Sequence, residues 1–144
     1  LFLGSEPTNF GFIVDRKRMI SEATDAISRL GINLPSVHTQ VSLLSGGQRQ
    51  GVAVARALLE SARATLMDEP TAALAVKEVG KVLDLIKGLK NLGVGVIVIS
   101  HRMDDIFTVS DRVMALFQGT NFAESLLKET SRDEVIGWIM GKKI

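Results

Sequence analysis

Residues 64–70 read ATLMDEP, a short apolar run that ends in two acids and a proline. Such a run is typical of a buried strand that delivers its carboxyl end to a site. A second run, VGVIVI at residues 94–99, is nearly all β-branched and predicts a central parallel strand. Between the two runs, apolar residues recur at helical spacing from Val76 to Leu89, and Gly93 closes the segment. This alternation predicts an α/β fold.

Two further helices are expected before this unit. Apolar residues repeat at helical spacing over residues 19–30, where Asp15 can cap the start and Gly31 can end the helix. Residues 47–61 are rich in valine and alanine and predict a second helix. The N-terminal part of the chain is therefore expected to be helical.

The C-terminal part continues with a strand and a helix. Residues 112–117 predict a further strand, with a turn at Gln118 and Gly119. Ser131 and Glu134 have the spacing of a capping box, which predicts the start of the last helix.

Composition limits the class of protein. The 144 residues, 46% hydrophobic and 23% charged, suit one globular domain or a large part of one. No apolar run reaches the length of about 18 residues that a spanning helix needs. A net charge of +1 does not indicate a basic surface of the kind that binds nucleic acid. The absence of cysteine excludes disulfides and thiolate metal sites. Because the chain begins at Leu1 within the run LFLG, we expect it to be truncated.

A turn at residues 44–48, LSGGQ, precedes the second helix. Ser45, Gly46, Gly47 and Gln48 would leave the first N–H groups of that helix unpaired, with the helix dipole behind them. Glycine also lets a phosphate approach the backbone without a Cβ in the way. The turn therefore predicts an anion site, and the alternative is an ordinary glycine-containing turn before a helix.

Three further residues follow strands. Asp68 can hold a hydrated magnesium ion, and Glu69 can orient a water molecule. The alternative is that these acids cap the segment that follows. His101 comes directly after the second strand run and could reach a bound phosphate, or it could be a surface histidine in a turn. His38 is interpreted as a loop residue, and Trp138 is expected to pack the final helix against the body.

Taken together, these motifs resemble the nucleotide-binding subunit of an ABC transporter. The matching parts are the signature motif at 44–48, the Walker B strand and catalytic acid at 64–69, the turn PTAAL at 70–74 and the switch histidine at 101. The sequence LMDEPTAAL, followed by VISHRMDDIF, is similar to the sequences of the branch that imports monosaccharides of the ribose, xylose and fructose type. The resemblance covers nearly the whole chain.

The resemblance implies roles for the signature residues. Ser45, Gly47 and Gln48 would contact the γ-phosphate of an ATP held chiefly by a second ATPase subunit, while Gly46 and Leu44 shape the turn. It also implies a head-to-tail dimer with ATP at the interface. This dimer would close when ATP binds and open when ATP is hydrolysed.

The resemblance also implies the catalytic chemistry and the partners. Asp68 would bind Mg²⁺ through water, Glu69 would act as general base, and His101 would sense the γ-phosphate. The partners would be transmembrane permease subunits and, indirectly, a periplasmic sugar-binding protein, with the ATPase peripheral on the cytoplasmic side of the inner membrane. No nucleic-acid partner is expected.

The implied fold is a partial P-loop NTPase, with a RecA-like parallel sheet and the ABC α-helical subdomain on its N-terminal side. The expected division is residues 1–61 for the helical subdomain and signature helix, 62–120 for the ATPase core and 121–144 for a C-terminal strand and helix. The strand that carries the phosphate cradle in this fold would lie between residues 94–99 and 112–117.

Two departures from the family pattern stand out. The position that carries aspartate in many D-loops is Ala75. No G-x-x-x-x-G-K-[ST] cradle occurs in the chain, so we expect a C-terminal part of a longer ATPase that is inactive alone. The alternatives are a soluble ABC-type ATPase acting on nucleic acid or ribosomes, and a non-hydrolytic scaffold cassette.

Overall fold

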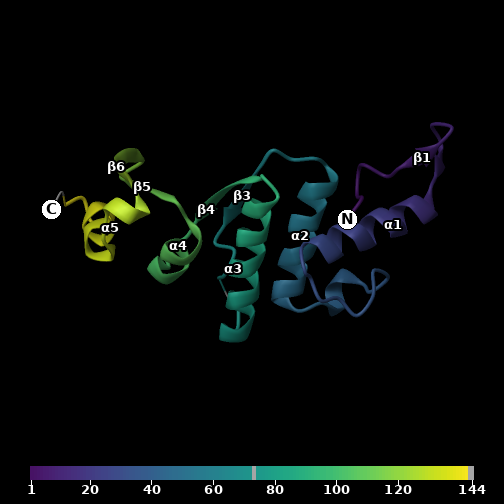
Figure 1. Cartoon of the computed structure of the whole chain (residues 1–144), viewed down its shortest axis with the longest axis horizontal. Coiled ribbons are helices and arrows are strands. Elements are labelled where there is room, and N and C mark those ends of the chain that lie inside the picture. The colour runs from purple at the N-terminus through teal and green to yellow at the C-terminus, as the bar shows by residue number, and fades with distance from the viewer. Residues whose placement is uncertain (73, 143–144) are drawn as a thin grey trace. The chain divides into compact units, whose positions relative to one another are not determined.

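The computed structural model describes residues 1–72 and 74–142, in two compact units, Leu1–Ile99 and Ser100–Ile144. Figure 1 labels most of their helices and strands. The turn expected at residues 70–74 contains Ala73, which lies outside the described residues. Each unit is considered separately below.

The centre of the first unit is a pair of parallel strands. β3 (Ala64–Asp68) pairs with β4 (Gly95–Ile99) in parallel, in a register that sets Asp68 opposite Ile99. The connection between them is α3 (Val76–Asn91), which lies beside β4 (Figure 1). Parallel strands joined by a crossover helix confirm the α/β prediction.

Within the described residues of the first unit, one face of this two-stranded sheet is covered and the other is not. Met67 is buried, and α3 buries an apolar stripe that consists of Val79, Val82, Leu85, Ile86 and Leu89. Side chains alternate between the faces of a strand, so Leu66 lies on the face opposite Met67 and is 63% exposed. Ile97, the partner of Leu66, is 59% exposed.

The prediction of a central strand at residues 94–99 is not met within the described residues. There, β4 pairs with β3 alone, and its isoleucines point away from α3. The β-branched run indicated a strand buried on both faces, but the described chain supplies a covering helix on one face only. Local composition cannot reveal how many neighbours a strand has.

The N-terminal part of the first unit packs two helices together. Its elements are β1 (Thr8–Asn9), β2 (Ile13–Val14), α1 (Arg16–Arg29), η1 (Val41–Leu43) and α2 (Gly46–Leu59). Asp15 caps α1 as predicted, because Arg18 N–H donates to Asp15 Oδ1 at 3.0 Å. That backbone hydrogen bond lowers the pKa of Asp15. Ala26 and Ile27 of α1 pack with Ala55 of α2 to form a small core.

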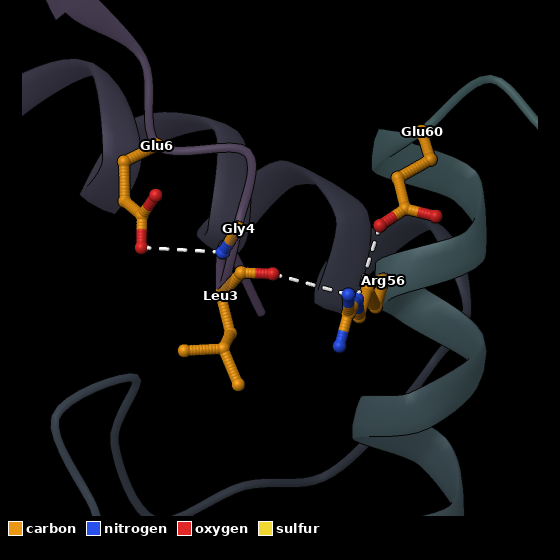
Figure 2. A network of polar contacts seen from close by, with 5 residues as sticks. All are labelled: Leu3, Gly4, Glu6, Arg56 and Glu60. Carbon is orange, nitrogen blue, oxygen red and sulfur yellow. Dashed lines mark hydrogen bonds and ion pairs between the residues drawn. The ribbon is translucent and has the colours of Figure 1, made fainter.

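Arg56 of α2 connects this helix to the start of the chain (Figure 2). Its Nη2 donates to the carbonyl of Leu3 at 3.0 Å, and its Nε donates to Glu60 Oε1 at 3.0 Å. Gly4 N–H donates to Glu6 Oε1 at 3.3 Å, within the same segment. The guanidinium therefore holds two segments together that are more than fifty residues apart in the sequence.

The second unit is a hairpin packed with two helices. Its elements are α4 (Met103–Val109), β5 (Arg112–Phe117), β6 (Thr120–Leu126), η2 (Leu127–Glu129) and α5 (Arg132–Ile139). Gln118 and Gly119 both have positive φ, 48° and 78°, as a two-residue turn between antiparallel strands requires. Both the strand and the turn are thus where the sequence predicted them.

The core of the second unit contains Trp138, which confirms its predicted packing role. Trp138 is buried with Ile106, Val113, Ala115 and Val135. The predicted capping box at the start of α5 is half formed: Glu134 N–H donates to Ser131 Oγ at 3.2 Å. The Glu134 carboxylate instead accepts from the Thr130 hydroxyl at 2.6 Å.

Among residues 1–72 and 74–142, none of the helices combines the length and the apolar character needed to span a bilayer.

Candidate functional site

The LSGGQ turn folds as a complete capping box at the start of α2. Gln48 N–H donates to Ser45 Oγ at 3.3 Å, and Ser45 N–H donates in return to Gln48 Oε1 at 2.9 Å. The Gln48 amide also donates to the Asn33 carbonyl at 2.8 Å. The Gln48 side chain is thus engaged with its own turn and with the loop after α1.

Sequence reasoning missed this box, although the spacing S-x-x-Q is its signature. The two glycines of the turn are also typical of an anion site, which is the role that the sequence predicted. In the structure the same four residues also form the start of α2.

Two backbone N–H groups of this turn take no part in the capping box. The N–H groups of Gly46 and Gly47 lie in the first turn of a 14-residue helix, and neither has an acceptor within the described part of the chain. The first N–H groups of a helix carry a partial positive charge and bind anions. The structure thus presents the donors that the anion-site prediction requires.

The first glycine of the turn also lies close to another side chain of the chain itself. A Cβ on Gly46 would lie 2.5 Å from Leu74 Cδ2, well inside van der Waals contact. A Cβ on Gly47 would lie 3.5 Å from Glu78 Cβ, which is an ordinary contact. The sequence predicted that an approaching phosphate is the reason for glycine here, and the structure adds Leu74 as a second reason.

Removing the Ser45 hydroxyl provides a test of the cap. We expect Ser45→Ala to lower the free energy of unfolding by about 1 kcal/mol, because the Gln48 N–H loses its acceptor. Urea denaturation followed by circular dichroism measures this change. Ser42→Ala, at an exposed serine just before the turn, is the matched control and should have little effect. Equal effects of the two changes would contradict the capping role.

The two acids at the end of β3 differ in environment. Asp68 is the last residue of β3 and is exposed, whereas Glu69 is half-buried. Glu69 N–H donates to the Ile99 carbonyl at 2.8 Å, which ties the residue to the end of β4. Glu69 has a φ of 45°, a left-handed conformation that is costly for a residue other than glycine. Such strained residues concentrate at functional sites.

The alternative that these acids cap the next helix does not apply to α3. That helix begins at Val76 with Ala75 as its N-cap, and no side chain caps it. The acids are separated from it by the turn that starts at Pro70, which is buried.

Asp68 is the residue that suits Mg²⁺. A single exposed carboxylate fits this ion, which keeps several waters and is bound through one or two carboxylates together with substrate phosphates. Within the described ranges, no group of three or more His, Cys, Asp or Glu side chains could hold a metal. The prediction that Asp68 binds Mg²⁺ through water therefore stays a prediction.

His101 belongs to the second unit and is described there alone. It is exposed, in the segment between Ser100 and the start of α4. Arg102 N–H donates to Ser100 Oγ at 3.0 Å, which shapes this turn. The interpretation of His101 as a phosphate sensor therefore stays a prediction.

The chain matches known proteins in the part that contains these motifs. The family model described as ABC transporter matches residues 4–72. The xylose/arabinose import ATP-binding protein of Sulfolobus acidocaldarius is 43% identical over 135 residues, which are 94% of this chain and 53% of the relative. The chain is therefore similar to ATP-binding proteins of ABC transporters. A ribose import ATP-binding protein of Lactococcus lactis is 39% identical over 144 residues, all of this chain and 29% of that relative.

Solved ABC cassettes share the fold. A cassette of an ABC transporter superposes with a TM-score of 0.73 and 26% identity, over 88% of this chain and 52% of that one. A dimeric cassette in a post-hydrolysis state bound to ADP and Pi gives a TM-score of 0.67 and 26% identity, over 88% and 53%. The predicted resemblance and the predicted fold are thus confirmed, and the chain spans about half the length of these cassettes.

Proposed function

We propose that this chain is part of the ATP-hydrolysing subunit of an ABC importer that takes up a monosaccharide. The observation that carries the proposal is the anion-binding turn, in which Gly46 and Gly47 present unpaired N–H groups at the start of α2. The names of the relatives, which are xylose/arabinose and ribose import proteins, support a sugar as the cargo.

The signature turn acts on an ATP that a second subunit holds. The N–H groups of Gly46 and Gly47 and the Ser45 hydroxyl face the γ-phosphate in this proposal. Gln48 contributes by holding Ser45 in place, since its side chain bonds to the turn and to Asn33. A head-to-tail dimer is part of this proposal, because in the family that the sequence resembles the signature of one subunit faces the nucleotide cradle of the other.

In this proposal, the carboxyl end of β3 supplies the side chains that take part in ATP hydrolysis. Asp68 would hold Mg²⁺ through water. When bound, this ion would neutralise part of the negative charge of the phosphates. Glu69 accepts a proton from the attacking water as general base. The hydrogen bond from Glu69 N–H to Ile99 fixes the backbone at this point. His101 contacts the γ-phosphate and reports its presence.

The membrane partners are permease subunits, and a periplasmic sugar-binding protein delivers the cargo to them. A largely apolar hollow of about 560 Å³ supports a protein contact on the first unit. Its lining includes Phe2, Met19, Ile27 and Leu44. The subunit is peripheral on the cytoplasmic face of the membrane in this proposal.

We further propose that the 144 residues alone do not turn ATP over, since a phosphate cradle is absent from their sequence. An ATPase assay of the purified chain checks this. Turnover that disappears in Glu69→Gln would contradict the proposed inactivity.

A segment exchange tests the importer function. The matching 144-residue segment of the Lactococcus lactis ribose import protein is replaced by this chain, and ATP hydrolysis and ribose uptake are measured. We expect both activities in the hybrid, because its cradle comes from the relative and its signature and acids come from this chain. A folded hybrid that binds ATP and neither hydrolyses it nor supports uptake would overturn the proposal.

A further inference from the structure

We propose that the hairpin of β1 and β2, together with the first turn of α1, binds the surface of a membrane that contains anionic lipids. The residues that form this surface are Phe10, Phe12, Ile13, Val14, Arg16 and Lys17, and they are called the hairpin surface below. The inference goes beyond the proposed function, because it concerns neither the signature turn nor the acids after β3.

The apolar half of the hairpin surface is exposed to water. Phe10 is 89% exposed and Phe12 is 79% exposed, and both lie in the short connection between β1 and β2. Ile13 and Val14, which form β2, are exposed as well. Within the described ranges, neither phenylalanine ring makes an aromatic or cation–π contact. Four neighbouring apolar side chains therefore remain in water, although their transfer to an apolar environment would be favourable.

Backbone hydrogen bonds give the hairpin a defined conformation. Asp15 N–H donates to the Pro7 carbonyl at 2.8 Å at the base of the hairpin. Phe12 N–H donates to the Asn9 carbonyl at 3.4 Å near its end. Phe10 has a φ of 55°, a left-handed conformation that is uncommon for a bulky residue. The hairpin thus holds an aromatic residue in a strained conformation, which is typical of functional sites.

The first turn of α1 adds positive charge directly after the apolar residues. Arg16, Lys17 and Arg18 follow one another there, and this turn contains no acid. Arg18 pairs with Glu22 at 2.6 Å, whereas the described part of the chain offers no ion pair to Arg16 or Lys17, which are both exposed. Positive charge is unfavourable at the N-terminal end of a helix. The stability of α1 therefore does not explain these cations.

This combination of side chains suits an anionic membrane. Aromatic and aliphatic side chains enter the boundary between headgroups and acyl chains, and nearby Lys and Arg are attracted to anionic lipids. Single-stranded nucleic acid also binds aromatic and cationic side chains. It suits this surface less well, because Ile13 and Val14 have no ring on which a base could stack. The apolar half and the cationic half together favour a lipid surface.

Sedimentation with vesicles tests the inference. The chain is mixed at low ionic strength with vesicles of phosphatidylglycerol or of phosphatidylcholine, and the fraction that sediments with the lipid is measured. We expect binding to phosphatidylglycerol to be about tenfold stronger, with a difference that shrinks as salt is added. The double change Phe10→Ser and Phe12→Ser should weaken binding about tenfold, because the apolar contact is lost. Arg16→Gln and Lys17→Gln should each weaken it about fivefold.

Matched controls carry the same kinds of change on α3. Val76→Ser removes an apolar side chain that is 89% exposed, the same fraction as Phe10. Lys81→Gln removes one positive charge from an exposed position. Both controls should bind phosphatidylglycerol vesicles as the wild type does. Circular dichroism checks that each variant is folded, which we expect because all the changed side chains are exposed.

Fluorescence follows the hairpin itself. Phe10→Trp keeps an aromatic ring and adds a reporter at the end of the hairpin. The chain contains one other tryptophan, Trp138, which is buried in the second unit, and the wild-type spectrum measures its emission. We expect the additional emission to shift to shorter wavelength with phosphatidylglycerol vesicles, because the ring leaves water. Emission that stays unchanged on vesicles that bind the chain would contradict contact through the hairpin.

The other outcomes are equally clear. A wild-type chain that does not sediment with phosphatidylglycerol would overturn the inference, and so would losses of the same size in Val76→Ser and Lys81→Gln. Binding of a single-stranded oligonucleotide that weakens in the hairpin variants, without vesicle binding, would assign the surface to nucleic acid instead. None of these measurements uses ATP, so their failure is distinct from a failure of the proposed function.

Discussion

Glu69→Gln is expected to lower ATP turnover of the ribose importer hybrid by a factor of about 10²–10⁴, the usual contribution of a general base. Glutamine has nearly the same shape and cannot accept the proton. The backbone bond from residue 69 to the Ile99 carbonyl does not involve the side chain, so the turn should persist. ATP binding should therefore survive while hydrolysis is lost, and single-turnover measurements separate the two.

The matched control is a change of carboxylate to amide at an exposed position. Asp84→Asn should keep the turnover of the hybrid within about twofold, because its side chain is on the outside of α3. A Glu69→Gln hybrid that turns over ATP at the rate of this control would show that another group takes the proton. The roles proposed for Asp68 and the LSGGQ turn would then need a different base.

Leu89→Ala is expected to lower the free energy of unfolding of the chain by about 2–5 kcal/mol. Leu89 is 0% exposed and lies in the apolar stripe by which α3 covers the sheet. The truncation removes buried surface and leaves a cavity between the helix and the strands. One face of the sheet is already exposed. Few other buried apolar contacts therefore remain at this sheet to stabilise the chain when the Leu89 side chain is lost. Chemical denaturation measures the effect.

Leu92→Ala provides the comparison on the same helix end. Leu92 is 38% exposed, and its role as the C-cap uses backbone N–H only, which alanine retains. We expect a loss of less than about 1 kcal/mol. A loss at Leu89 no larger than at Leu92 would mean that α3 does not hold the sheet together.

Local patterns in the sequence were sufficient for most helices and strands. The strand before Asp68 and the strand at residues 112–117 are where periodicity and turn residues predict them. Helix caps at Asp15 and Ser131 are correct as well, because a cap depends on residues three positions apart. These features involve neighbours along the chain, and the chain order alone brings them together.

The candidate site was predicted in part. The acids at the end of β3 and the donors at the start of α2 follow from the order of the motifs and from general helix physics. The left-handed backbone of Glu69 could not be predicted, because no local residue pattern indicates it, and the same holds for its hydrogen bond to the Ile99 carbonyl of the neighbouring strand. The geometry does not test the role predicted for His101, which stays a prediction.

The sequence by itself determined the α/β class, the resemblance to ABC transporter ATPases and the positions of the signature and the acids. Only the tertiary structure decided what surrounds the LSGGQ turn. Leu74 approaches Gly46, and the Glu78 carboxylate lies along Gly47, although both are about thirty residues further along the chain. Contacts between helices depend on how faces pack in space, which no local spacing encodes. For the same reason the sequence suggested a strand buried on both faces, whereas packing by α3 covers only one.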